Sequence, residues 1–220
     1  MKYLGFSVNS GAENMQIDSD LLENAIASET KEVLFRLYGW SPKCISLGRN
    51  QKADFLTGEI DAVRRLTGGR ALLHDDEITY CCVAPVDVLP NGQSVVESYK
   101  YISGILIDFF KTLGVELDFG ENKRVSTHYD YCMLLSTGAD VCYKGQKIIG
   151  SAQCRKNGYI LQHGSILFGY DKIFLEHLFH EEVQGITTVK QILPSLTKED
   201  FVQKFEEFLC STFPTSSDRI

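Results

Sequence analysis

Apolar residues along the chain follow helical spacing in some blocks and strand spacing in others. Apolar positions three and four residues apart predict four helices, which cover residues 14–28, 95–113, 171–180 and 197–210. Alternation and short apolar runs predict strands over residues 32–40, 44–47, 71–74 and 78–84, followed by a strand meander over 140–168. The dipeptides Lys144-Gly145 and Asn157-Gly158 suit hairpin turns. This order of elements predicts an α+β fold with a mixed, largely antiparallel central sheet flanked by helices.

Local signals mark where the helices and the domain end. Ser94 and Thr197 precede apolar helical runs and are expected helix N-caps, and Gly114 suits the position after a helix. No linker or repeat divides the chain. We therefore expect one domain over residues 1–213 and a frayed tail, rich in Pro, Ser and Thr, over 214–220.

The chain of 220 residues has a formal net charge of −7, which limits the classes of molecule that it can bind. A chain without a basic excess cannot neutralise many phosphates, so nucleic acid is an unfavourable partner. No apolar run is long enough to span a bilayer, and residues 1–30 do not resemble a signal peptide. These features predict a cytoplasmic protein that does not associate with membranes.

The chain has seven cysteines, none of them in a Cys-x-x-Cys pair. An odd number without paired spacing argues against a disulfide framework and against a structural zinc site. No histidine cluster has metal-ligand spacing, so we predict no metal site. Reduced thiols are expected, which leaves individual cysteines available for packing or for chemistry.

Residues 64–80 combine arginines, a Gly-Gly pair and a His-Asp pair in the run RRLTGGRALLHDDEITY. Gly68 and Gly69 have no Cβ, so a ligand can approach their backbone N–H groups. Arg65 and Arg70 add positive charge and forked donors on either side. An arginine-rich turn between two strands is the simpler interpretation, but the whole run favours a loop that binds a phosphate-bearing or acyl-bearing ligand.

Further segments extend the pattern over residues 4–170. They include RLYGW at 36–40, SLGRNQ at 46–51, GQKIIGSAQ at 145–153 and LQHGSIL at 161–167. Together with the Gly-rich run, their order and spacing resemble the biotin/lipoate A/B protein ligase (cofactor transferase) family. That family contains lipoate–protein ligases, octanoyltransferases and biotin ligases. The resemblance implies the same mixed sheet with flanking helices, and acyl-transfer chemistry for the domain over 1–213.

Cys132 lies fifteen positions before Lys147, and Ser136 follows it by four. This spacing resembles the cysteine-dependent octanoyltransferases, as does the run Thr67-Gly68-Gly69-Arg70. The resemblance implies that Cys132 is the nucleophile and that Lys147 favours its thiolate and handles a proton. The octanoyl group would pass from acyl carrier protein to Cys132. It would then pass to a lysine of a lipoyl-domain protein, such as glycine-cleavage H protein or a dehydrogenase E2 subunit, without a cofactor.

The remaining predicted site residues surround the Gly-rich run and the two later segments. The substrate-binding set is Arg65, Thr67, Gly68, Gly69, Arg70, His74, Gly150, Ser151, Ala152, His163 and Gly164. Backbone N–H groups near Gly150 and Ser151, or in the Gly68-Gly69 loop, are alternative oxyanion donors. His74 contacts the ligand or ties the strand end to the loop. His163 is interpreted as a core or pocket-rim histidine rather than a catalytic one.

Two other functions stay open at this point. An ATP-dependent lipoate–protein ligase would need ATP and magnesium, and Asp140 occupies the position where the resemblance places a magnesium-binding acid. A non-catalytic lipoyl-binding or acyl-binding module would keep the pocket without a working nucleophile or Lys147. The presence of both residues makes the module the least favoured alternative.

Overall fold

Two sheets form the framework of the computed structural model, which describes residues 1–120, 130–134 and 140–213. The larger sheet has seven strands in the order β1-β2-β6-β10-β9-β8-β7, and the smaller has three in the order β4-β3-β5. In the larger sheet only the β1–β2 pair is parallel, and in the smaller only β3–β4. The prediction of an α+β fold with a mixed, largely antiparallel sheet is confirmed.

The strands and helices alternate along the chain. The strands are β1 Lys2–Asn9, β2 Leu34–Trp40, β3 Cys44–Leu47, β4 Ala62–Arg64, β5 Leu72–His74, β6 Glu77–Pro85, β7 Asp118–Phe119, β8 Val141–Tyr143, β9 Gln146–Lys156 and β10 Tyr159–Leu167. The α-helices are α1 Gly11–Ala27, α2 Val95–Thr112, α3 Lys172–Phe179, α4 Val189–Ile192 and α5 Lys198–Thr212. Short 3-10 helices cover Val86–Val88 and Cys132–Leu134.

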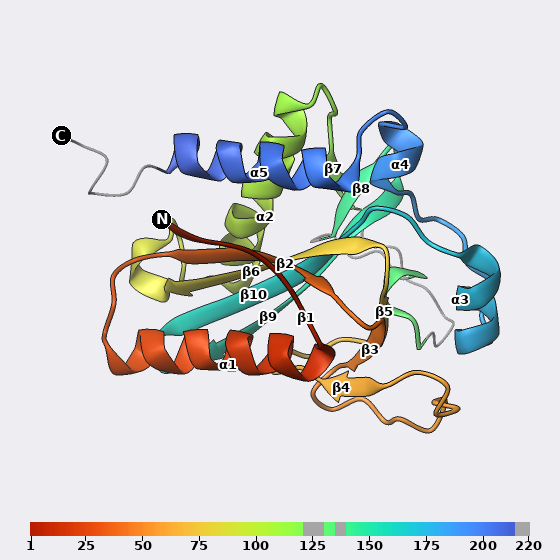
Figure 1. Ribbon diagram of the computed structural model, residues 1–220. Coiled ribbons are helices and arrows are strands. Elements are labelled where there is room, and N and C mark those ends of the chain that lie inside the picture. Colours follow the sequence, from red (N-terminus) through yellow and green to blue (C-terminus); the bar gives the residue numbers. More distant parts are fainter. Residues whose placement is uncertain (121–129, 135–139, 214–220) are drawn as a thin grey trace.

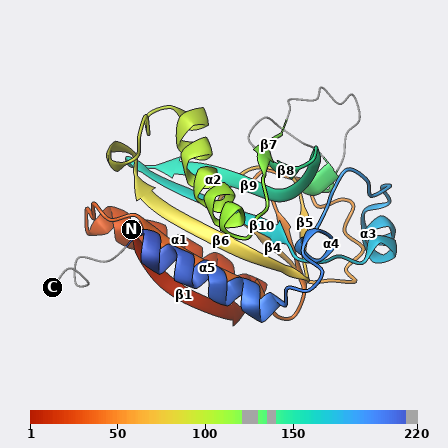
Figure 2. The same ribbon diagram turned by 90° about the horizontal axis from the view of Figure 1, so that it is seen from above.

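Helices cover both faces of the larger sheet (Figures 1 and 2). α2 and α5 pack on one face, where Phe35 of β2 meets Phe109 and Phe205 in an apolar cluster. α1 packs on the opposite face, where Leu22 and Ala25 meet strand residues that include Tyr38. Because side chains alternate along a strand, β2 supplies both faces, and from Phe35 to Trp40 all of its residues are buried.

The smaller sheet adjoins the α1 side of the larger sheet and packs with α3. Ile45 and Leu73 of this sheet share a cluster with Leu175 and Phe179 of α3. Tyr131 joins the same cluster and is fully buried. The space between the two sheets is therefore bounded on several sides by well-packed elements.

The predicted helices and the predicted strands of the larger sheet agree with the structure to within a few residues. Ser94, Asp171 and Thr197 cap α2, α3 and α5, and Gly114 has φ +77° after α2. Both predicted Gly turns have the positive φ values of hairpin turns at Lys144-Gly145 and Asn157-Gly158. β1, β4, β7 and α4 were not predicted, because β1 alternates weakly and the other three are only two to four residues long. The tail 214–220 and Ser136 lie outside the described residues.

Candidate active site

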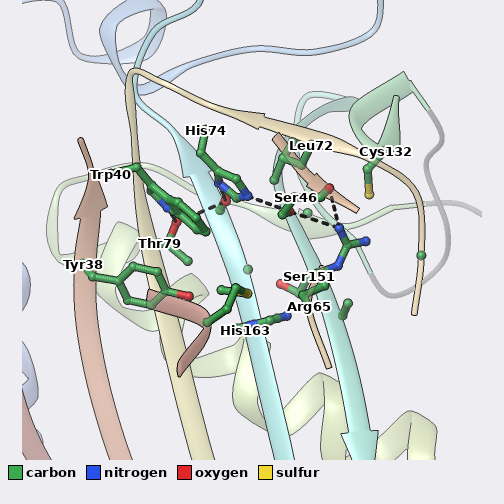
Figure 3. A pocket seen from close by; sticks show the side chains of 16 residues that line it. Tyr38, Trp40, Ser46, Arg65, Leu72, His74, Thr79, Cys132, Ser151 and His163 are labelled. Carbon is green, nitrogen blue, oxygen red and sulfur yellow. Dashed lines mark hydrogen bonds between the residues drawn. The ribbon is translucent and has the colours of Figure 1, made fainter. Parts of the chain in front are cut away.

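A pocket lies between the two sheets on the α1 side of the larger sheet. Its lining residues are Met15, Tyr38, Trp40, Ser46, Arg65, Gly69, Leu72, His74, Thr79, Cys132, Gly150, Ser151, Ala152, His163, Gly164 and Ser165. The enclosed cavity has a volume of about 50 Å³, and about 440 Å³ of space is open when its mouth is included. Figure 3 shows Cys132 on one side and Tyr38 with Trp40 on the other, so a chain-like ligand could extend between them.

Cys132 is held at the pocket by main-chain contacts to the segment after the Gly-rich loop. Its N–H donates to the Ala71 carbonyl at 2.7 Å, and the Ala71 N–H donates to Asp130 at 3.0 Å. The Glu181 carboxylate accepts from the Asp130 and Tyr131 N–H groups. The Cys132 side chain is half-buried, which leaves the thiol accessible from the pocket.

Lys147 approaches Cys132 from behind the pocket wall. Its Nζ lies 3.1 Å from the main-chain oxygen of Cys132 and 3.1 Å from Asp140 Oδ1. The Lys147 and Asp140 side chains are both almost fully buried, so the ion pair is shielded from solvent. A Cβ at Gly150 would lie 3.1 Å from Lys147 Cε and 2.8 Å from Met133 Sδ. Gly150 therefore leaves room for the lysine beside the nucleophile segment.

The Gly-rich loop is shaped by arginine side chains that bond its backbone. Arg65 donates to the main-chain oxygens of Gly68 and Arg70. Gly69 has φ +94°, a conformation that favours glycine, and a Cβ there would lie 2.9 Å from Arg65 Nη2. Arg64 in turn donates to three main-chain oxygens of residues 48–51. The loop is thus fixed before any ligand binds.

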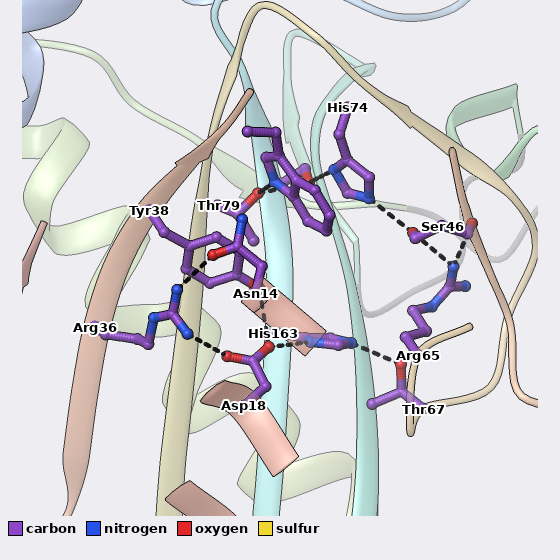
Figure 4. A network of polar contacts seen from close by, with 12 residues as sticks. Asn14, Asp18, Arg36, Tyr38, Ser46, Arg65, Thr67, His74, Thr79 and His163 are labelled. Carbon is purple, nitrogen blue, oxygen red and sulfur yellow. Dashed lines mark hydrogen bonds and ion pairs between the residues drawn. The ribbon is translucent and has the colours of Figure 1, made fainter. Parts of the chain in front are cut away.

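Two histidines extend polar networks to the pocket (Figure 4). His163 Nδ1 lies 2.9 Å from Asp18 Oδ2, and its Nε2 lies 2.7 Å from the Thr67 hydroxyl. His74 Nδ1 lies 2.5 Å from Glu77 Oε1, and its Nε2 lies 2.7 Å from the Ser46 hydroxyl. Each histidine therefore links a buried carboxylate to a hydroxyl beside the Gly-rich loop.

Further contacts stabilise both carboxylates. Asp18 also accepts from Arg36 and from the Tyr38 hydroxyl. Glu77 Oε1 also accepts from the Thr79 and Ser165 hydroxyls. The Trp40 ring stacks on His74 with 3.7 Å between centroids. The polar groups of this wall mostly satisfy one another, so they present a preorganised surface to a ligand.

Known proteins match both the sequence and the fold. The chain matches the sequence model of the lipoyl protein ligase A/B catalytic domain over residues 10–210. The chain belongs to this family. Two curated relatives named octanoyltransferase LipM come from Carboxydothermus hydrogenoformans and Macrococcus caseolyticus. The first is 41% identical over 75% of this chain and 64% of its own length, and the second 38% over 91% and 84%.

A solved structure of lipoate-protein ligase A bound with ATP has the same fold. Its TM-score is 0.72 at 18% identity, over 96% of this chain and 85% of the solved one. The family resemblance deduced from the sequence is therefore confirmed. The aligned region spans slightly less than two thirds of the first curated relative.

Within this lipoyl ligase A/B domain, the structure gathers most of the predicted site residues. Nine of them line the pocket: Arg65, Gly69, His74, Cys132, Gly150, Ser151, Ala152, His163 and Gly164. Gly68 and Arg70 instead line a neighbouring depression with Asn50 and Lys52. Thr67 is fully buried and supports His163, and Lys147 lies behind the wall. Thr67 and Lys147 therefore act on the pocket through other residues.

The sequence interpretation did not select several lining residues, among them Tyr38, Trp40, Thr79 and Ser165. These residues occupy alternate positions of β2, β6 and β10, on the face covered by α1. Polar residues at alternate positions of otherwise apolar strands were the available signal. Their significance depends on strand pairing, which places Tyr38 opposite Thr79.

Within residues 1–120, 130–134 and 140–213, no helix combines the length and apolarity needed to cross a membrane. Among the same residues, no three His, Cys, Asp or Glu side chains are placed to hold a metal ion.

Proposed function

We propose that this chain is an octanoyltransferase that forms a thioester on Cys132 and passes the octanoyl group to a lysine of a lipoyl-domain protein. The observation that supports this most directly is the position of Cys132. It lines a preformed pocket while its own carbonyl contacts Lys147. The name octanoyltransferase shared by relatives at 38–41% identity supports the same reaction.

The proposed first step exchanges one thioester for another. The Cys132 thiolate attacks the octanoyl carbonyl of acyl carrier protein, a C–S bond forms, and the carrier's C–S bond breaks to release the carrier thiolate, which takes up a proton from solvent. The carrier thioester is already activated, so no nucleotide or other cofactor is required. The main-chain amides at Gly69 and Gly150 are the proposed oxyanion donors, because both residues line the pocket with Cys132.

The second step forms the amide. The acceptor lysine, as a neutral amine, attacks the Cys132 thioester, so a C–N bond forms and the C–S bond breaks. The amine proton returns the Cys132 thiolate to a thiol, with Lys147 as the proposed proton carrier. The acceptor is expected to be a lipoyl-domain protein such as glycine-cleavage H protein or an E2 subunit. We place this catalytic acyltransferase domain at residues 1–213, in the cytoplasm.

One observation favours an ATP-dependent ligase as the second candidate. Asp140 lies beside Lys147, where a carboxylate could hold a magnesium ion, and the fold is that of a ligase solved with ATP. The Asp140 carboxylate is nevertheless almost fully buried and paired with Lys147. A metal would have to displace the ammonium, which favours the transferase.

A transfer assay separates the two candidates. The protein is mixed with octanoyl-loaded acyl carrier protein and a lipoyl-domain acceptor without ATP, and the acceptor mass is followed. A parallel reaction contains free octanoate, ATP and magnesium. The proposal predicts octanoylated acceptor only in the first reaction. Product in the second reaction alone would establish the ligase instead.

A further inference from the structure

Three cationic side chains in the described part of the chain are almost fully buried. They are Arg36, Arg65 and Lys147, at 4%, 7% and 2% exposure. Arg36 is paired with Asp18, and Lys147 is paired with Asp140. Arg65 has no carboxylate within ion-pair distance among the described residues. A buried charge without a counter-charge is costly, so the surroundings of Arg65 need an explanation.

Among the described residues, the groups that accept hydrogen bonds from Arg65 are all neutral. Nη1 donates to the carbonyl and the hydroxyl of Ser46 at 2.9 and 3.1 Å. Nε and Nη2 donate to the main-chain oxygen of Gly68 at 3.2 and 2.9 Å, and Nη2 donates to that of Arg70 at 2.7 Å. These contacts fix the guanidinium in place without cancelling its charge.

The fixed guanidinium and the Cys132 thiol belong to the same pocket. Arg65 and Cys132 line the same pocket, and Figure 3 shows the Cys132 sulfur directed toward the Arg65 guanidinium. Burial lowers the pKa of Arg65, and the negative charge that Cys132 acquires on ionisation counteracts this lowering. The thiolate is therefore a counter-charge available to this cation inside the pocket.

A relay of side chains holds Arg65 in this orientation (Figure 4). The Ser46 hydroxyl accepts from Arg65 and contacts His74 Nε2, and His74 Nδ1 contacts Glu77. Glu77 is the carboxylate at the end of the relay, but a hydroxyl and an imidazole separate it from Arg65. It can orient Arg65 without forming an ion pair with it.

Lys147 is directed differently. In the described part of the chain its ammonium contacts the main-chain oxygen of Cys132, while Asp140 balances its charge. Such a contact fixes the nucleophile segment but gives the sulfur little net positive charge. The Asp140 carboxylate therefore balances the charge of Lys147, whereas no described carboxylate lies within ion-pair distance of Arg65.

We propose that Arg65 is the cation that stabilises the Cys132 thiolate, and that Ser46, His74 and Glu77 are its positioning residues. This deepens the proposed function, in which Cys132 is the nucleophile. The thiol proton leaves to solvent through the pocket mouth, and the thiolate remains as the partner of the guanidinium. The ammonium of Lys147 is left to handle protons in the later steps.

Other ionisable groups also surround Cys132. Among the described residues they include Asp130, Tyr131, Tyr99, Lys147, Asp140 and Glu181, together with His74 and His163 of the pocket lining. Burial keeps the pKa of Tyr99 and Tyr131 well above the ordinary value, so both stay neutral near pH 7. The carboxylates disfavour a thiolate, so the cation that opposes them decides whether it forms.

The test measures how alkylation of Cys132 by iodoacetamide depends on pH. Peptide mass spectrometry follows Cys132 and the exposed Cys210 in one sample, so Cys210 is an internal reference. In the wild type we expect iodoacetamide to modify Cys132 faster than Cys210 at neutral pH. Arg65→Gln should raise the Cys132 midpoint by about one unit or more. Lys147→Gln should raise it less.

The charge-retaining Arg65→Lys variant is the matched control, and its midpoint should stay near the wild-type value. An unchanged midpoint in folded Arg65→Gln, or a larger shift in Lys147→Gln, would overturn the proposal. Circular dichroism establishes that each variant folds.

Glu77→Gln provides a test that does not alter Arg65. Glu77 Oε2 has no hydrogen-bond partner among the described residues, so an amide nitrogen there breaks no contact. Glu77 positions Arg65 through His74 and Ser46, so losing its charge should loosen the guanidinium and raise the Cys132 midpoint, by less than Arg65→Gln does. An unchanged or lowered midpoint would show that Glu77 does not position Arg65 and would contradict this part of the proposal. Alkylation needs no acyl donor, so this experiment is independent of whether Cys132 becomes octanoylated.

Discussion

The two faces of the seven-stranded sheet bury the same strands against different kinds of partner. On the α2 and α5 face, Phe35 packs against Phe205, and Phe109 stacks on Phe205 at 4.1 Å. On the α1 face, the neighbouring β2 residue Arg36 pairs with Asp18 of α1. The α2 and α5 face is held mainly by apolar contact, whereas the α1 face adds a buried network of charged and polar groups to its own apolar cluster.

This difference suggests that one face mainly stabilises the fold and the other mainly positions chemical groups. Apolar packing tolerates changes that conserve volume, whereas a buried polar network depends on each donor and acceptor. The pocket lies on the polar face, where hydrogen bonds orient His163, His74 and Arg65. The α1 face, whose interactions are more sensitive to substitution, is therefore the one that positions the reacting groups.

The largest expected contrast in stability comes from one size-conserving substitution on each face. Asp18→Asn leaves the buried Arg36 guanidinium without its counter-charge, which should lower the free energy of unfolding by about 3–5 kcal/mol. Leu106→Met in α2 conserves volume within the apolar cluster and should cost less than about 1.5 kcal/mol. Urea denaturation of both variants measures the difference. Equal losses would show that the two faces do not differ as described.

Backbone geometry in the Gly-rich loop gives a smaller contrast. Gly69→Ala adds a Cβ 2.9 Å from Arg65 Nη2 at a φ of +94°, so it should cost about 1–3 kcal/mol. Gly68→Ala is the control, because a Cβ at Gly68 meets nothing within 4 Å. It should change stability by no more than about 1 kcal/mol. Thermal and urea unfolding measure the stability of both variants. An equal loss of stability in Gly68→Ala and Gly69→Ala would contradict this explanation.

Cys81 and Cys82 are adjacent on β6 and face opposite sides of the sheet, so they predict how stability depends on pH on each face. Cys82 faces the apolar cluster, where burial raises the pKa of its thiol to about 12 from 9.0. The unfolded chain therefore releases this proton at lower pH, and stability should fall as pH rises from about 9 to about 12. The slope per fully titrating thiol is about 1.4 kcal/mol per pH unit.

Cys82→Ala should make this alkaline loss of stability shallower. Cys81 on the α1 face also has a raised pKa, with burial as the main cause and Asp18 as a second. Cys81→Ala should therefore flatten the same limb of the stability curve. Urea unfolding at pH 8, 9 and 10 measures the slopes, and a slope that neither substitution alters would rule out this assignment.

Much of the fold was predictable because its signals are local. Ser94, Thr197 and Gly114 mark helix ends through contacts within a few residues, and the structure has them in those roles. β1 was not predicted, because Gly5 and a register shift interrupt the alternation of its apolar and polar residues. A short strand such as β4 depends on its neighbours rather than on its own sequence.

The site was only partly predictable, because its geometry depends on distant pairings. The sequence indicated that Cys132, Lys147 and the Gly-rich loop belong together. It did not indicate that Lys147 would contact the carbonyl of Cys132, or that Ser46 would connect Arg65 to His74. Those contacts follow from the arrangement of two sheets, which no local pattern encodes.

The central claim is that Cys132 accepts an acyl group from an already activated donor. The most direct measurement is the mass of the protein after incubation with octanoyl-loaded acyl carrier protein, without ATP, followed by peptide mapping. The account predicts one octanoyl adduct on Cys132 that disappears in Cys132→Ala. An unmodified protein, or an adduct that persists in Cys132→Ala, would contradict it.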